Sequence, residues 1–458
     1  MRRVVNVHWG LRGLVGLAAM VAAQSAGAET LNDALAKAYL NNPDINQQRA
    51  GVRAADEGVP KARAGYFPTA SAEADVGFTR LQTNVANFNT QPRGVGLTVQ
   101  QTLWNGNRTE NAVKSAETGV MSSREQLRST EESVLLAAAT AYMDVMRDTA
   151  ILSLNKSNVD VLNEQLRQTK DRFDVGEVTR TDVAQAEASL AGAQSQVLTS
   201  SSNLNASIAN FRLYVGEQPK SLSPTGPLSK GLPKSVQDAV SVAQLEHPSV
   251  VGALHAVDSA ELAVKVAEGA LYPTVGVTGS VSQRYDPSNQ SPGVHGVTGT
   301  VSGQITVPIY QGGAEYASIR QAKEQLGQAE LQSDLARDKV RDAVVAAWGA
   351  NQNSLGVVRS DKAQVAAAEV ALAGTREEAK VGQRTTLDVL NAQQVLLNAR
   401  VALVTGQHDA VVNSYNLMAA IGRLSPANLG LRVASYDPTT HFDQVKSKWF
   451  GVRTPDGK

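Results

Sequence analysis

Few residues of this 458-residue sequence have the types and spacing that catalysis needs. It contains no phosphate-binding P-loop, no H-E-x-x-H or G-x-S-x-G motif and no dinucleotide-binding glycine motif. Cysteine is absent, and the six histidines are scattered without the spacing of metal ligands. The sequence therefore predicts that the protein is not an enzyme, and we expect no catalytic residue, no metal ion and no cofactor.

The polar residues that do form a pattern lie in two related motifs, Val175–Val183 and Val381–Val389. In each motif a glycine, Gly176 or Gly382, follows a long run without proline and accepts the left-handed conformation that a helix C-terminus favours. A Thr then precedes an Asp by three positions, which is the spacing of a capping box at the start of a new helix. Each motif therefore predicts the turn between two antiparallel helices.

The charges of these turns have two interpretations. Arg384 and Asp388 lie one helical turn apart, and Asp182 occupies the position equivalent to Asp388. Capping alone accounts for the acids, because the helix macrodipole favours negative charge near an N-terminus. In a ring of several copies, however, the same charges would meet around an axis and narrow a channel. The spacing by itself leaves both interpretations open.

Long helices must position these turns. The run from Asn107 to Val175 has no proline and, if helical throughout, spans roughly 100 Å at 1.5 Å per residue. Apolar residues recur every seven positions on both sides of each turn, which predicts antiparallel coiled coils. The first repeat comprises Val145, Leu152, Val159, Leu166 and Phe173, followed by Val183, Leu190, Val197, Leu204 and Phe211. The return helix covers only half the length of the long helix. An N-terminal helix from Leu31 to about Ala64, stacked end to end on the return helix, would cover the other half.

Two pairs of segments alternate between apolar and polar residues, as half-buried strands do. They cover residues 70–79 and 94–100 in the first half, separated by a polar loop, and residues 275–281 and 297–309 in the second. Segments of about ten residues have the length that a tilted strand needs to cross a bilayer. Either pair alone could equally be a soluble hairpin. Because four strands cannot close a barrel and open edges are not tolerated in lipid, membrane insertion would require an oligomer.

The sequence divides into five parts. Three arginines, an apolar run and the cleavage motif Ala26-Gly27-Ala28 predict a signal peptide. The predicted parts are the signal peptide (1–28), a first helix–strand–strand–helix repeat (29–215), a linker (216–235), a second repeat (236–430) and a C-terminal tail (431–458). The 43 basic residues balance the 43 acidic ones, which gives no reason to expect a nucleic-acid partner.

The sequence resembles the TolC-type outer-membrane channel family over nearly its whole mature length. The resemblance rests on the V-G-x-x-T-x-x-D-V turn in each half, the duplicated order of segments, and the junctions between helices and strands. Those junctions are Tyr66-Phe67-Pro68, Leu103-Trp104-Asn105-Gly106, Leu271-Tyr272-Pro273 and Ile309-Tyr310-Gln311-Gly312-Gly313. The resemblance implies a mixed α and β membrane protein with four transmembrane strands per chain. Three chains would close a 12-stranded β-barrel in the cell outer membrane, continued by an α-helical periplasmic tunnel.

The family resemblance also implies a function and partners. The protein would be the passive outer-membrane exit channel of a tripartite export system, working with a periplasmic adaptor (membrane fusion) protein and an ABC-type inner-membrane transporter. We favour type I protein secretion, because the tail from Tyr436 to Trp449 looks like that branch of the family. Multidrug efflux is the alternative. A trimeric coiled-coil adhesin is less favoured, since adhesins carry one barrel segment at a terminus rather than two internal hairpins.

The same resemblance assigns roles to residues of the two turns. The channel entrance would comprise Asp388 and Asn391. The latch network that keeps the entrance shut would comprise Thr181, Asp182 and Arg384. The adaptor would dock at the tips formed by Gly176 and Gly382. The sequence departs from the family pattern twice, because Asn391 replaces a second ring acid of some members and Ala379 stands where a network tyrosine can occur.

Overall fold

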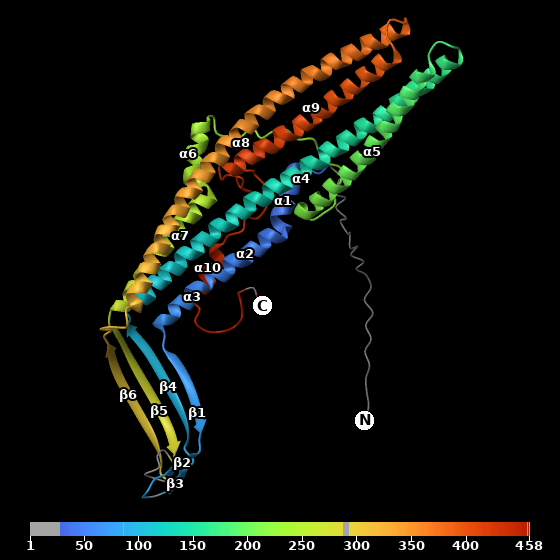
Figure 1. The fold of residues 1–458 in the computed structure, drawn as a ribbon. Coiled ribbons are helices and arrows are strands. Elements are labelled where there is room, and N and C mark those ends of the chain that lie inside the picture. The colour runs from blue at the N-terminus through green and yellow to red at the C-terminus, as the bar shows by residue number, and fades with distance from the viewer. Residues whose placement is uncertain (1–27, 86, 287–292, 456, 458) are drawn as a thin grey trace, which may run out of the picture.

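The computed structural model describes residues 28–85, 87–286, 293–455 and 457, so the predicted signal peptide lies outside the described residues except for Ala28. The molecule is elongated, with strands at one end and two helical turns at the other (Figure 1). The elements of the first half are α1 (Leu31–Asn41), α2 (Pro43–Asp56), α3 (Gly58–Arg63), η1 (Ala64–Tyr66), β1 (Thr69–Val76), β2 (Thr79–Gln82), β3 (Asn87–Thr90), β4 (Arg93–Trp104), α4 (Arg108–Asp174) and α5 (Arg180–Val215).

The second half repeats this order of elements. It contains α6 (Val236–Glu246), α7 (Pro248–Glu268), η2 (Gly269–Leu271), β5 (Thr274–Tyr285), β6 (His295–Thr306), α8 (Ala314–Lys380) and α9 (Thr386–Ala420), followed by α10 (Thr439–Val445) in the tail. The long helices α4 and α8 have 67 residues each. The duplicated arrangement of long antiparallel helices and four main strands confirms the predicted fold class for a single chain.

Each long helix lies beside two shorter stretches of helix. Helix α4 packs against α5 on one side of the molecule's midpoint and against α1, α2 and α3 on the other. Helix α8 packs in the same way against α9 and against α6 and α7. Helix α4 also contacts α7 and α9, which joins the two halves into one body. The main apolar core lies midway along the molecule, where these short helices meet α4 and α8.

The seven-residue repeat is buried more completely in the second hairpin than in the first. The sequence continues the repeat on α9, where Val389, Leu396, Ala410 and Leu417 are buried and Leu403 is half-buried. On α4 the predicted residues Leu152, Val159 and Leu166 are only half-buried. The buried stripe of that helix lies three positions further along and is mostly polar, comprising Asp148, Asn155, Leu162 and Thr169. Small residues on α5 allow this close, hydrogen-bonded contact.

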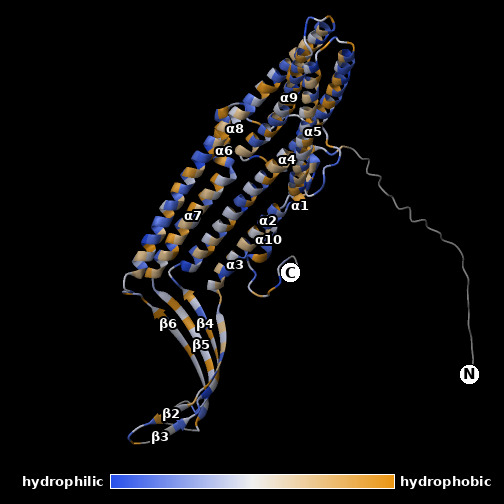
Figure 2. Cartoon of the chain, turned by 45° about the vertical axis from the view of Figure 1, so that its right-hand side comes forward, coloured by the Kyte–Doolittle hydropathy of each residue, from blue (hydrophilic) through white to orange (hydrophobic). Residues whose placement is uncertain are grey.

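The four main strands form an antiparallel sheet in the order β1-β4-β5-β6. Its register places apolar residues side by side, as in the row Ala72, Leu97 and Val281 and the row Ala70, Val99 and Val301. Polar residues occupy the alternate rows, for example Ser71, Thr98, Ser280 and Thr300. The sheet therefore has one mainly apolar and one mainly polar face, as the alternation predicts. Hydrophobic and hydrophilic residues are likewise interspersed along the helices (Figure 2).

Several predicted segments differ from the structure, among them the first strand, which ends at Val76 rather than at residue 79. The N-terminal helix is broken at Asn42, because Pro43 begins α2 and Asn42 caps it. The polar loop after the first strand includes a small hairpin in which β2 pairs with β3. The last strand ends at Thr306 rather than at Ile309.

Among the described residues, no helix is both long enough and apolar enough to span a membrane.

The C-terminal tail is folded against the first half of the chain. Val445 of α10 is fully buried, and His441 Nδ1 lies 2.8 Å from Oδ2 of the buried Asp56 on α2. Burial raises the pKa of Asp56, although the hydrogen bond from His441 opposes this shift. Further on, the ring of Trp449 stacks against Phe67 with 6.4 Å between the ring centres. The tail therefore reaches from the central core to the junction of helices and strands.

Candidate channel entrance at the helical tips

Both helical hairpins turn through the same motif. Gly176 has φ +82° and Gly382 has φ +79°, the left-handed conformation that glycine adopts without a Cβ penalty. In the first turn the amide of Gly176 donates to the carbonyl of Phe173, and the amide of Glu177 donates to that of Arg172, both at 2.9 Å. This is a Schellman motif, and the second turn repeats it. A Cβ on either glycine would meet no atom within 4 Å, so the backbone conformation alone requires glycine.

Each return helix begins with the predicted capping box. In α5 the amide and hydroxyl of Thr179 donate to Oδ2 of Asp182 at 2.8 and 2.7 Å. In α9 Thr385 donates in the same two ways to Asp388, at 2.9 Å each. These bonds hold the pKa of both aspartates below the ordinary value, with the hydroxyl bond dominant for Asp182 and the backbone bond for Asp388. Both tips therefore carry a fixed negative charge at neutral pH.

The charged residues of the proposed latch do not meet within one chain. Arg384 Nε donates to Oε2 of Glu378 in the last turn of α8 at 2.8 Å, and both side chains are about half exposed. Among the described residues no ion pair links Arg384 to Asp182, and the exposed side chain of Thr181 makes no hydrogen bond. A contact between Arg384 of one tip and Asp182 or Thr181 of the other would thus have to join neighbouring copies of the chain. The exposed side chain of Arg384 could reach such a neighbour.

Asn391 lies one turn beyond Asp388 and lines a cavity between the two hairpins. This cavity has a volume of about 530 Å³ and is bounded by α4, α5 and α9. Seven of its lining side chains are amides, namely Asn155, Asn158, Gln196, Asn391, Gln393, Gln394 and Asn398. Gln393 donates to Asn158 across the cavity at 3.4 Å. Of these amides only Asn391 was predicted, although the helical spacing of Asn391, Gln394 and Asn398 is visible in the sequence.

A buried polar cluster deeper along the hairpins was also missed. His408 of α9 is 7% exposed and lies 3.0 Å from Asp144 of α4 and 2.8 Å from Asp409. Burial opposes protonation of His408, but the two carboxylate bonds outweigh it and raise its pKa. Arg147 pairs with Asp144 at 2.8 Å, so the cluster ties α4 to α9. Such residues lie far apart in the sequence, and no local motif brings them together.

The arrangement of the tips can bind and repel ions but offers no catalytic pair. Among the described residues no group of three or more His, Asp or Glu side chains could hold a metal ion. Half-buried aspartates, an exposed arginine and an amide-lined cavity lie towards one end of the long helices, and a sheet with one apolar face lies at the other. Fixed charges at the end of a helical tube set which ions enter it. The charges at the tips are therefore placed where they could attract or repel ions.

The duplicated helical hairpins and the strands at their far end define the class of outer-membrane channel proteins. The family model described as "Outer membrane efflux protein" matches residues 34–217 and 239–423, and the chain belongs to this family. Membership confirms the predicted TolC-type channel class, the location in the outer membrane and the absence of enzyme activity.

Individual relatives agree with this assignment. The chain is 43% identical to the outer membrane efflux protein BepC of Brucella suis over 435 residues, which cover 95% of this chain and 94% of BepC. It is 24% identical to the outer membrane protein TolC of Escherichia coli, over 91% of this chain and 87% of TolC. The crystal structure of the CmeC outer membrane channel of Campylobacter jejuni has the same fold, with a TM-score of 0.77 at 17% identity over 91% of this chain and 89% of CmeC.

Proposed function

We propose that this protein is the outer-membrane exit channel of a tripartite export system and that its main cargo is small molecules. The observation that carries the proposal is the duplicated chain itself, in which long helical hairpins end in capped, charged tips and the opposite end is a sheet with one apolar face. The name of BepC, an efflux protein similar over nearly the full length, favours efflux. A periplasmic adaptor and an inner-membrane transporter would complete the system at the tips.

Three copies would close the channel. Within the described residues β1 and β6 lie at the two edges of the sheet, each with one neighbouring strand. An edge strand exposes unpaired backbone groups, which are not tolerated in lipid. Pairing β6 of one copy with β1 of the next would remove every edge, and three copies of four strands give a closed cylinder of twelve. The same three-fold ring would bring the six helical tips together.

The tips would then act as the entrance and its latch. Three Asp388 carboxylates around the axis would attract cations, and Asn391 one turn deeper adds amide groups without charge. Arg384 of one copy would meet Asp182 of its neighbour, either sharing or leaving its bond with Glu378. We expect Asp388→Ala to abolish block of the channel by divalent cations in planar bilayers. An unchanged block would reduce Asp388 to a helix cap.

Type I protein secretion is the second candidate. Its support is the C-terminal tail, which looks like that of the secretion branch and packs against α2 and Phe67. An ABC-type transporter would be the partner in that case, whereas small-molecule efflux is also compatible with a proton-driven pump.

Deleting the gene in its own host separates the two candidates. Efflux predicts increased accumulation of amphipathic dyes and antibiotics with an unchanged set of proteins in the culture medium. Secretion predicts that a protein disappears from the medium while dye accumulation stays the same. Complementation with the intact gene is the control. A deletion strain that exports both kinds of cargo normally would contradict both proposals.

A further inference from the structure

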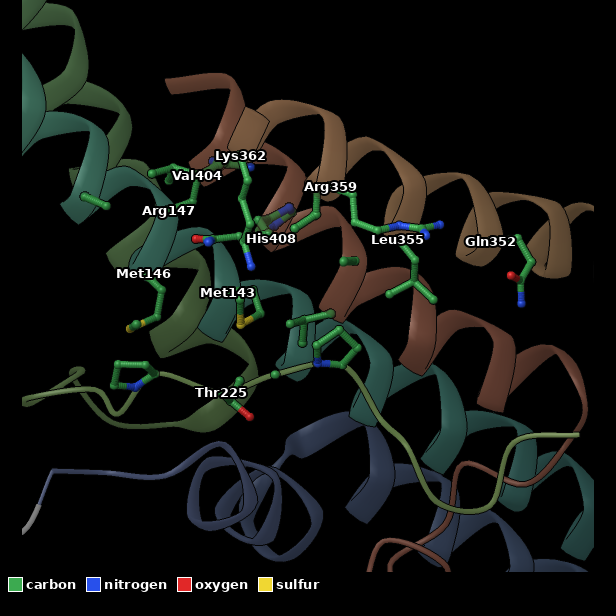
Figure 3. Close-up of a pocket in the computed structure, with 18 residues that line it drawn as sticks. Met143, Met146, Arg147, Thr225, Gln352, Leu355, Arg359, Lys362, Val404 and His408 are labelled. Atoms are coloured by element: carbon green, nitrogen blue, oxygen red, sulfur yellow. The ribbon is translucent and has the colours of Figure 1, made fainter. Parts of the chain in front are cut away.

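A separate cavity lies midway along the helices, away from the tips (Figure 3). Its volume is about 750 Å³, within the range of small-molecule binding sites. Helices α4 and α8 contribute opposite sides, α9 contacts both helices between them, and the linker residues Pro224 to Pro227 close one end. The cavity is lined by none of the residues predicted for the entrance, the latch or the docking tips.

The interior of the cavity is mainly apolar. Met143 of α4 and Val411 of α9 are 6% and 2% exposed and form part of its buried surface. Met146 and Leu355 continue the apolar lining towards solvent, and Leu355 remains 38% exposed. Methionine side chains are flexible and adapt to ligands of different shape. An exposed apolar lining of this kind gains free energy when a hydrocarbon group covers it.

The rim of the cavity carries two cations without acidic partners. Arg359 and Lys362 lie three residues apart on α8, on one side of the helix, and both are exposed. Among the described residues neither side chain has a carboxylate within 4.0 Å or any hydrogen bond. Arg147 on the opposite side differs, because Asp144 and Asp148 each lie 2.8 Å from its guanidinium. The free positive charge therefore gathers on the α8 side.

We propose that this cavity binds an amphipathic anion with a single hydrocarbon chain. The carboxylate or sulfate of the ligand lies between Arg359 and Lys362, since a guanidinium forms paired hydrogen bonds with such groups. The hydrocarbon chain lies against Met143, Met146 and Leu355. A ligand with the same chain and a cationic head finds no carboxylate among the lining residues and is repelled by the two cations. The proposal does not depend on which cargo the channel exports.

Calorimetric titration of decanoate into the purified full-length protein in a nonionic detergent tests the proposal, with detergent alone as the blank. We expect saturable binding of decanoate and none of decyltrimethylammonium, which has the same chain and the opposite charge. The double variant Arg359→Gln/Lys362→Gln should bind decanoate at least about tenfold more weakly, because it loses two charge-assisted contacts. Its matched control is Lys339→Gln/Arg341→Gln, which removes two exposed cations of the same helix outside the cavity and should bind as the wild type does.

A second variant tests the apolar part. Leu355→Gln changes a partly exposed side chain, so the helix should fold normally, and it should weaken decanoate more than it weakens butyrate. The proposal is overturned if decanoate does not bind, which is also the outcome expected if another copy of the chain fills the cavity. Equal binding of the cationic ligand, or equal losses in the two double variants, would overturn it as well.

Discussion

At the scale of single residues, the aspartates of the tips have a local role that the sequence made visible. Asp182 and Asp388 complete capping boxes with Thr179 and Thr385, at the predicted spacing. Arg384 has a local partner that the sequence analysis overlooked, since Glu378 lies across the turn and within hydrogen-bond distance. The contact between copies that the latch requires stays a prediction, because it involves a second chain.

The latch prediction can be tested with one residue. Arg384→Ser should raise the single-channel conductance in planar bilayers severalfold, because three equivalent contacts are lost around one opening. The control is Lys380→Ser, which removes a neighbouring cation that pairs with Glu377 at 2.7 Å and should leave the conductance unchanged. If Arg384→Ser also left it unchanged, Arg384 would serve only to bind Glu378 at the end of α8.

A buried acid of α4 predicts a dependence of stability on pH. Burial raises the pKa of Glu132 from 4.5 to about 8, and the charge of Arg128 only partly opposes this. Because the folded-state pKa is raised, the unfolded chain releases this proton at a lower pH than the folded chain does. The free energy of unfolding is therefore highest below pH 4.5, with respect to this group, and falls as the pH rises to about 8. The free energy of unfolding falls by at most about 1.4 kcal/mol for each pH unit, which is the free-energy equivalent of one pKa unit.

Thermal unfolding at pH 5 and pH 8 measures this effect. Glu132→Gln, which has no charge to bury, should lose less stability than the wild type between the two pH values. Asp160→Asn provides the control, since it neutralises an exposed carboxylate of the same helix. A wild type and a Glu132→Gln variant with the same pH dependence would show that Glu132 is solvated or paired in the assembled protein.

At the scale of elements, the sequence predicted what depends on local chemistry. Glycine at a left-handed position and Thr followed by Asp each determine a few neighbouring residues, and the structure has the turns in those places. The two faces of the sheet also follow from the two-residue alternation. Contacts between distant segments did not follow, which is why the amide-lined cavity and the contact of His408 with Asp144 were missed. The pairing of β2 with β3 is local, and it was missed because the segment was interpreted as a polar loop.

The stripe of α4 shows the limit of apolar patterns. A repeat of apolar residues predicts which face packs, but small partners on α5 allow polar residues to be buried instead. Asn155 donates to Ser200 at 2.6 Å, and Ser207 donates to Asp148, so the buried side of this pair is stabilised by hydrogen bonds. Polar residues recurring at seven-residue spacing opposite alanine and serine would have indicated this arrangement.

The turns themselves predict how export can be lost without unfolding the protein. Gly382→Val places a β-branched residue at φ +79°, where left-handed backbone costs about 1–2 kcal/mol. We expect dye export to fall while the amount of inserted protein stays normal, because the strain is confined to the surface where the adaptor would dock. Gly374→Val, the same change within helix α8, should export normally. Normal export by Gly382→Val would remove the tip from the docking site.

At the scale of the whole molecule, a single chain does not account for the proposed channel. One copy supplies a curved row of helices and a four-stranded sheet with two edge strands, and the part of the chain that the structure describes encloses no passage by itself (Figures 1 and 2). The proposed entrance, latch and membrane-spanning cylinder all need neighbouring copies. The number of copies is therefore the property on which the account depends most.

Native mass spectrometry of the full-length protein, extracted from membranes in a mild detergent, tests this property directly. We predict a single species with three times the mass of one chain, since three copies remove all sheet edges and a closed ring cannot grow further. Engineered cysteines, one in β1 and one in β6, should cross-link copies into dimers and trimers only, against a background without native cysteines. A stable monomer with folded strands, or a ladder extending beyond three copies, would contradict the account.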